Sequence, residues 1–189
     1  MKVSSVVTTP NPDALKFTLD QELLKEGSRS FTSFKAAEVD PLAKLLFELE
    51  GVTSVFYMMN FVTVNKKADL EWEPLEKSIL EALRGFEPPV EEVEAKVVEG
   101  VGGAEGTPYG EMSPAQKVLA IDQLLEREIR PGLAGDGGGL EIVGLEENIL
   151  QIHYEGACGS CPSSTSGTLM YIESILKANL DENLSVIPV

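Results

Sequence analysis

Hydrophobic and polar residues follow two different periods along this chain, and the periods predict a mixture of strands and helices. Residues 15–19 alternate between apolar and polar side chains, which is typical of a half-buried strand. The runs 52–58 and 61–66 are rich in β-branched and aromatic residues and meet at Met59-Asn60. Two such runs separated by a two-residue turn predict a hairpin.

Helical periods flank these strands in the first half. Asp40 and Pro41 open the run 41–50 with an N-cap residue followed by proline at the first helical position, and we expect Gly51 to end this helix. Residues 72–86 carry leucine and isoleucine along one stripe, which predicts a second amphipathic helix.

The second half begins with a strong helix signal over residues 113–129. Ser113 is expected to cap the helix and Gln116 to complete a capping box, with Pro114 at the first helical position. The sequence Arg130-Pro131-Gly132 is expected to stop the helix.

The remaining elements predict a small antiparallel sheet backed by two helices. A glycine-rich turn leads into a strand over 140–145, and a second strand over 149–156 places His153 on its polar face. A helix over 163–180 and a short strand over 185–189 complete the order α-β-β-α-β.

Between these halves the composition changes abruptly. Residues 86–112 carry seven acidic side chains and one basic one, together with Pro88-Pro89 and Gly102-Gly103. Such a segment cannot bury enough apolar surface to offset the entropy of ordering it. We therefore expect an α+β protein of two small domains, residues 1–86 and 113–189, each a mainly antiparallel sheet with two helices, joined by an acidic flexible linker over 87–112.

Net charge and hydropathy exclude several classes of function. The 189-residue chain carries a net charge of −16, which repels nucleic acid phosphates and anionic membranes. Its apolar runs fall short of the roughly 20 residues that a membrane-spanning helix requires. The first residues match neither a secretory signal nor an organelle presequence. We expect a cytoplasmic protein, or the mature form of an organellar one.

The two cysteines of the chain, Cys158 and Cys161, lie in the sequence GACGSCPSST between a predicted strand and a predicted helix. Thiols three positions apart on a tight turn can face one metal centre. The unpaired N–H groups and partial positive charge of the following helix terminus favour thiolates.

Several kinds of site use such a pair. A thioredoxin-type redox site has the same spacing, but that fold needs more elements after the motif than the 28 residues that follow Cys161. An intramolecular zinc site needs four ligands, and His153 reads as a solvated strand residue. A zinc-bridged interaction module is a further alternative. An iron–sulfur cluster requires four thiolates, which two copies of the chain could supply together.

The residues around this pair resemble a known family. The run from Asp136 through the hairpin to Cys158 and Cys161, after Ile-Arg-Pro, is similar to the C-terminal domain of NifU and of the Nfu iron–sulfur scaffold proteins. The segments TPNPDALKF, DPLAKLLFELEGVTSVF and NFVTVNK resemble the N-terminal domain of two-domain Nfu proteins. Relatives often carry an acidic residue after Asp136-Gly137-Gly138, where this chain has Gly139. We interpret that triplet as a turn with positive φ rather than a ligand.

The resemblance implies a scaffold or carrier rather than an enzyme. Its expected cargo is a labile 4Fe-4S cluster, or a 2Fe-2S cluster, bound by Cys158 and Cys161 and shared by a homodimer. The expected partners are a cluster donor of the assembly machinery and apo iron–sulfur proteins as recipients. The alternative of a thiol–disulfide oxidoreductase stays open at this point.

Overall fold

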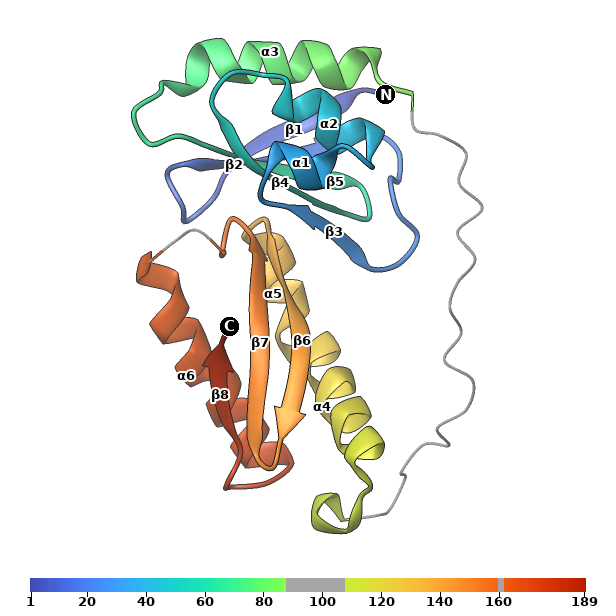
Figure 1. Cartoon of the computed structure of the whole chain (residues 1–189), viewed down its shortest axis with the longest axis vertical. Helices are drawn as coiled ribbons and strands as arrows, with labels where there is room; N and C mark the ends of the chain where they lie inside the picture. The colour runs from blue at the N-terminus through green and yellow to red at the C-terminus, as the bar shows by residue number, and fades with distance from the viewer. Residues whose placement is uncertain (88–107, 160–161) are drawn as a thin grey trace. The chain divides into compact units, whose positions relative to one another are not determined.

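The structure is a computed structural model that describes residues 1–87, 108–159 and 162–189, without the side chains of 162–166 (Figure 1). Each half of the chain combines helices with a sheet, which confirms the predicted α+β class.

The described residues form two compact units. The first consists of residues 1–87 together with two short loops from the second half of the chain, 135–139 and 155–159. The second consists of the rest of the described C-terminal half. The loop that carries Cys158 therefore belongs to the same compact unit as the N-terminal sheet.

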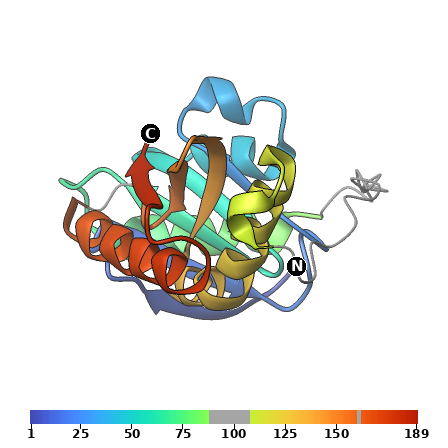
Figure 2. The same cartoon turned by 90° about the horizontal axis from the view of Figure 1, so that it is seen from below.

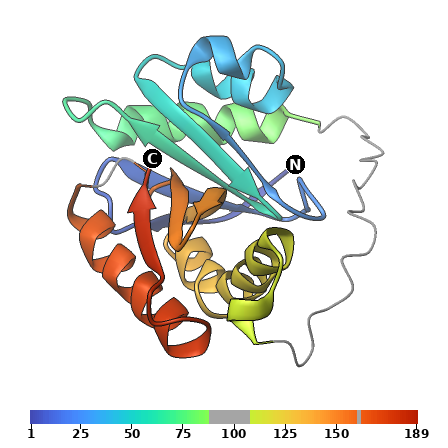
Figure 3. The same cartoon turned by 60° about the horizontal axis from the view of Figure 1, so that its bottom comes forward.

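The N-terminal half is a five-stranded sheet in the order β1-β2-β5-β4-β3, in which every neighbouring pair is antiparallel. Helices α1, α2 and α3 lie on one side of this sheet (Figure 3). In chain order the elements are β1 Val3–Thr8, β2 Ala14–Leu19, β3 Ser28–Phe31, α1 Phe34–Ala37, α2 Pro41–Phe47, β4 Val52–Met58, β5 Phe61–Lys66 and α3 Trp72–Gly85.

The core of this half lies between the helices and one face of the sheet. Alternate residues of the three central strands pack against the leucines and isoleucine of α2 and α3 in one apolar cluster. The sheet residues in that cluster are Leu15, Phe17, Leu19, Val55, Tyr57, Val62 and Val64. Because strand residues alternate between faces, their neighbours lie on the opposite face, away from the helices.

Asp40 caps α2 as predicted, and its side chain also joins a buried polar cluster. Its Oδ1 accepts a hydrogen bond from the backbone N–H of Ala43 at 2.8 Å. Its Oδ2 accepts one from the hydroxyl of Tyr57 and pairs with the guanidinium of Arg29 at 2.8 Å. Burial, reinforced by the bond to Asp40, raises the pKa of Tyr57. The helix itself is shorter than predicted and ends at Phe47, before the turn at Gly51.

Two edge strands of the first sheet, β1 and β3, were absent from the sequence prediction. None of the six residues of β1 is buried, and β3 has only four residues. Each is held by backbone pairing to one neighbour, β1 to β2 and β3 to β4. Edge strands of this kind need little side-chain burial, so they leave a weak hydrophobic pattern.

The C-terminal half contains a three-stranded sheet in the order β6-β7-β8. Helices α4 and α6 contact each other and lie on the same side of this sheet (Figure 2). Its elements are a 3₁₀ helix η1 Tyr109–Glu111, α4 Pro114–Glu128, α5 Arg130–Gly135, β6 Gly138–Glu146, β7 Ile149–Gly156, α6 Pro162–Asn179 and β8 Ser185–Pro188. The capping box of Ser113 and Gln116 is present as predicted.

Two features of this half differ from the prediction. β8 pairs with β7 in parallel, because α6 returns the chain across the sheet before β8 begins. Helix α4 ends at Glu128, before Arg130-Pro131-Gly132 as predicted, but these residues then open the short helix α5, which the sequence did not predict. Proline is compatible with the first turn of a helix, since the N–H that it lacks has no partner there.

The predicted linker ends earlier than expected. Residues 109–111 form η1, and the buried ring of Tyr109 lies under the ammonium group of Lys117 at 5.1 Å. The preceding part of the predicted linker, 88–107, lies outside the described residues. Among the described residues, none of the helices is both long and apolar enough to span a membrane.

Candidate functional site

Cys158 lies in the connection between β7 and α6, as the sequence predicts. Gly156 ends β7 with a φ of +64°, and the chain then turns through Ala157 to the half-buried Cys158. Helix α6 begins at Pro162. Cys161, the second predicted ligand, lies outside the described residues, so its place relative to Cys158 stays a prediction.

The glycine-rich turn 136–138 packs directly against the cysteine loop. The backbone N–H of Ala157 donates to the carbonyl oxygen of Gly137 at 3.1 Å. A Cβ atom added at Gly138 would lie 2.6 Å from Sγ of Cys158 and 2.9 Å from the carbonyl oxygen of Glu155. The absence of a side chain at Gly138 is therefore what leaves room for the sulfur.

Positive φ angles in both segments keep this packing close. Gly137 has a φ of +77°, which confirms the predicted turn. A Cβ at Gly156 would lie 2.5 Å from the carbonyl oxygen of Gly137. The two segments thus form one tight backbone platform that holds Cys158. The sequence prediction interpreted Asp136-Gly137-Gly138 as an isolated turn and missed its contact with the cysteine loop. The high number of glycines in both segments was a visible signal of such close packing.

Polar side chains from the N-terminal half bind the same loop. Nδ2 of Asn11 donates to the carbonyl oxygen of Ala157 at 3.1 Å, and Nδ2 of Asn65 donates to that of Gly156 at 3.2 Å. The hydroxyl of Ser28 donates to Oε2 of Glu155 at 2.7 Å. The sequence prediction found no functional group in the N-terminal half, because an isolated asparagine carries no signal of a partner so distant in the chain.

A cation lies beside the glycine turn. Nζ of Lys16 is 3.5 Å from the carbonyl oxygen of Gly135 and 4.2 Å from the ring centre of Phe61. Burial lowers the pKa of Lys16, while the carboxylate of Asp136 acts in the opposite direction. The ammonium group therefore offsets part of the negative charge of Asp136 close to the cysteine loop.

His153 is exposed, as predicted. Its Nδ1 lies 2.9 Å from the carbonyl oxygen of Val189. Over residues 1–87, 108–159 and 162–189, no three acidic, histidine or cysteine side chains lie together in a way that could hold a metal ion.

Comparison with known proteins gives a match in each half of the chain. Residues 4–87 match the family model described as the N-terminal domain of the scaffold protein Nfu/NifU, and residues 121–187 match the NifU-like domain.

Curated relatives align with nearly the whole chain. NifU-like protein 5, mitochondrial, of Arabidopsis thaliana is 34% identical over 93% of this chain and 63% of its own length. The NFU1 iron-sulfur cluster scaffold homolog, mitochondrial, of Drosophila persimilis is 32% identical over 94% of this chain and 62% of its own length. The chain therefore spans less than two thirds of the length of these relatives.

A solved structure also matches part of the chain. The crystal structure of a Staphylococcus aureus protein is 28% identical, with a TM-score of 0.40, over 44% of this chain and 99% of its own.

The two family matches occur one after the other along the chain, and the alignments to NifU-like and NFU1 proteins extend across both. The chain belongs to the Nfu/NifU family.

Proposed function

We propose that this protein is a carrier of iron–sulfur clusters that binds its cargo through Cys158 and Cys161 and delivers it to apo-proteins. The observation that supports the proposal most is the position of Cys158, half-buried on a glycine platform in front of a helix. The name of one relative, an iron-sulfur cluster scaffold homolog, supports the same cargo.

The ligand count sets the form of the complex. A cluster of the 4Fe-4S or 2Fe-2S type is usually bound by four thiolates, and one chain has two cysteines. Two chains that meet at their cysteine loops complete the set, with the cluster on the two-fold axis between them. We therefore propose a homodimer when the cluster is bound, with 4Fe-4S as the cargo.

Transfer from such a site requires only ligand exchange. Each iron–sulfur bond to Cys158 or Cys161 is replaced by a bond to a thiolate of the recipient, and neither the cluster nor the carrier changes its oxidation state. A site made of two short loops offers few other contacts to the cluster, so release is easy. The proposed role is thus non-enzymatic, between a cluster donor and apo iron–sulfur proteins.

Anaerobic reconstitution with iron and sulfide tests the binding. The wild-type chain should gain visible absorption together with protein-bound iron and sulfide, and Cys158→Ser and Cys161→Ser should each lose them. Wild-type protein alkylated before reconstitution is the control for iron that binds without the thiols. Circular dichroism of each variant shows whether the loss of iron reflects loss of fold.

Two results would contradict the proposal. If both serine variants take up as much iron and sulfide as the wild type, the cysteines are not the ligands. If the protein takes up no cluster but reduces the disulfides of insulin, the alternative of a thiol–disulfide oxidoreductase is correct.

The cytoplasmic location stays a prediction, and the named relatives are mitochondrial.

A further inference from the structure

The face of the N-terminal sheet opposite its helices is a surface built to fit the cysteine loop. Phe56, Phe61, Thr63 and Asn65 lie outside the helix-packed core, yet each is at most 3% exposed. Helices α1, α2 and α3 pack on the other face of the sheet, so the burial of these four residues comes from another part of the chain.

The glycines of the two loops supply that cover. A Cβ added at Gly139 would lie 3.0 Å from the ring of Phe56, and one at Gly156 would lie 2.8 Å from the same ring. A Cβ at Gly137 would lie 3.0 Å from the hydroxyl oxygen of Thr63. Three glycines thus meet the sheet where side chains would not fit, which is the close shape match of a packed interface.

Hydrogen bonds fix the position of the loop on this face. Asn11 and Asn65 are 5% and 2% exposed, and their amides donate to the carbonyl oxygens of the two residues that precede Cys158. Buried amide donors of this kind are costly to leave without acceptors, so they favour one loop conformation strongly.

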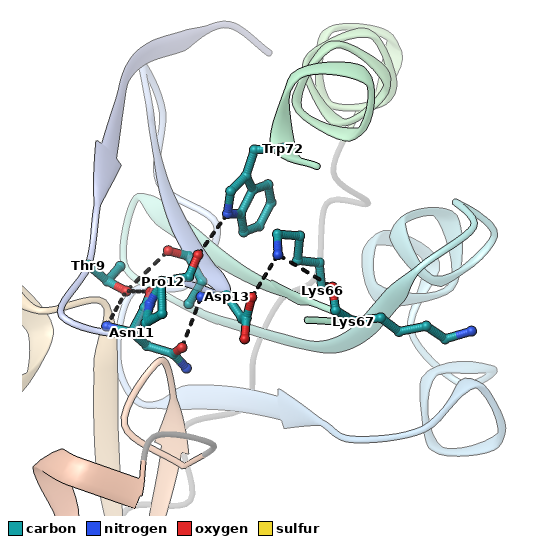
Figure 4. A network of polar contacts seen from close by, with 8 residues as sticks. Thr9, Asn11, Pro12, Asp13, Lys66, Lys67 and Trp72 are labelled. Atoms are coloured by element: carbon teal, nitrogen blue, oxygen red, sulfur yellow. Dashed lines mark hydrogen bonds and ion pairs between the residues drawn. The ribbon is translucent and has the colours of Figure 1, made fainter. Parts of the chain in front are cut away.

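Asn11 is itself held rigidly (Figure 4). Its Oδ1 accepts a hydrogen bond from the backbone N–H of Asp13 at 3.0 Å, and the hydroxyl of Thr9 donates to its carbonyl oxygen at 2.9 Å. Asp13 pairs with the ammonium of Lys66 at 2.6 Å, and the indole N–H of Trp72 donates to Pro12 at 2.9 Å. This network connects the Asn11 turn to β5 and α3, so the amide is oriented before the loop binds.

We propose that the face of the N-terminal sheet opposite its helices is a docking surface for the cysteine loop of the same chain. Asn11 and Asn65 are the positioning residues that hold the metal-free loop on this face. What the docking controls, the exposure of Cys158 to a second chain, rests on the proposed function. The docking itself does not depend on a cluster.

Thiol reactivity in metal-free protein tests the docking directly. In a Cys161→Ser background, Cys158 is the only thiol, and its rate of alkylation reports how often the loop is undocked. Asn65→Asp and Asn11→Asp each remove the amide donor and place a carboxylate against a carbonyl oxygen of the loop. Asn11→Asp keeps the side-chain oxygen that accepts from the backbone N–H of Asp13. We expect each to raise the alkylation rate about tenfold.

Gly139→Glu undocks the loop by a second route. Its side chain enters the space taken by the ring of Phe56 and leaves both asparagines in place. The same increase is expected for this variant, whereas Asn179→Ala, at an exposed position of α6, is the matched control and should react like the background protein.

The outcomes separate cleanly. Faster alkylation in the three docking variants, with a wild-type circular dichroism spectrum, supports the proposal. Equal rates in all variants would falsify it, and so would rates that depend on protein concentration, since the loop would then dock on a second copy. Because no iron is present, failure here leaves cluster binding untouched, and failure of reconstitution leaves the docking untouched.

Discussion

At the scale of single residues, the site depends on side chains that are missing rather than on those that are present. Gly138 and Gly156 allow two backbone segments to approach within a distance that no other residue permits. Gly138 has an ordinary φ, so space alone requires glycine there, whereas Gly156 is needed for its positive φ as well.

Gly138→Ala should therefore disturb the site through one methyl group. The added Cβ would lie 2.6 Å from Sγ of Cys158, so the loop has to move. We expect a loss of about 1–3 kcal/mol in the free energy of unfolding, typical of overpacking, and a lower cluster content after reconstitution. Gly135→Ala is the control, because its Cβ would meet no atom within 4 Å. Equal stability and cluster content in the two variants would show that the packing argument is wrong.

Tyr57→Phe tests the buried cluster around Asp40. The hydroxyl of Tyr57 donates to a carboxylate that is 2% exposed, and its removal leaves that oxygen with one partner fewer. We expect urea denaturation to show a loss of about 1–3 kcal/mol. Tyr171→Phe, at a residue that is 54% exposed, should change stability little. A Tyr57 variant as stable as the Tyr171 variant contradicts the structural role.

At the scale of elements, the sequence predicted the features that depend on neighbouring residues in the chain, such as the helix N-caps. Asp40 and Ser113 are N-caps in the structure because capping needs only residues one turn away. The strands β1 and β3 were missed because their positions are set by backbone pairing to distant segments. The parallel pairing of β8 could not be predicted either, since it depends on the path of α6 rather than on the residues of β8.

The attachment of α6 to β8 predicts a response to acid. Lys177 and the backbone N–H of Val186 both bond the carboxylate of Glu173, and these bonds, that of Lys177 first, lower its pKa. The stabilisation that the ionised Glu173 gives to the fold is complete above the pKa of about 4.3 that a glutamate has in the unfolded chain. It is lost as the pH falls through the lower pKa of Glu173 in the folded protein.

Unfolding measured against pH checks this expectation. Wild-type stability should fall below about pH 4.3 more steeply than that of Glu173→Gln, and the two should converge in strong acid. The pH profile of Glu126→Gln, at another carboxylate paired across one helical turn, serves for comparison. Parallel profiles for the wild type and Glu173→Gln would mean that the α6–β8 contact contributes nothing through this carboxylate.

At the scale of the whole molecule, the sequence predicted the position of Cys158 between a strand and a helix, but not how its loop is held. The hydrogen bond from Asn11 to Ala157 joins residues 146 positions apart, and that from Asn65 to Gly156 joins residues 91 apart. Nothing in a short sequence window distinguishes these asparagines from surface ones. The contacts that hold the loop follow from the fold, whereas the motif alone predicts the two cysteines as ligands.

The mass of the cluster-loaded protein tests the central claim most directly. Native mass spectrometry of anaerobically reconstituted protein, with iron and sulfide measured on the same sample, counts chains and cluster atoms together. If two chains share one cluster, the mass should correspond to two chains and one cluster. This dimer should disappear when a chelator removes the iron. A single chain that retains a complete cluster would contradict the account, because its two cysteines supply only half of the usual thiolate ligands.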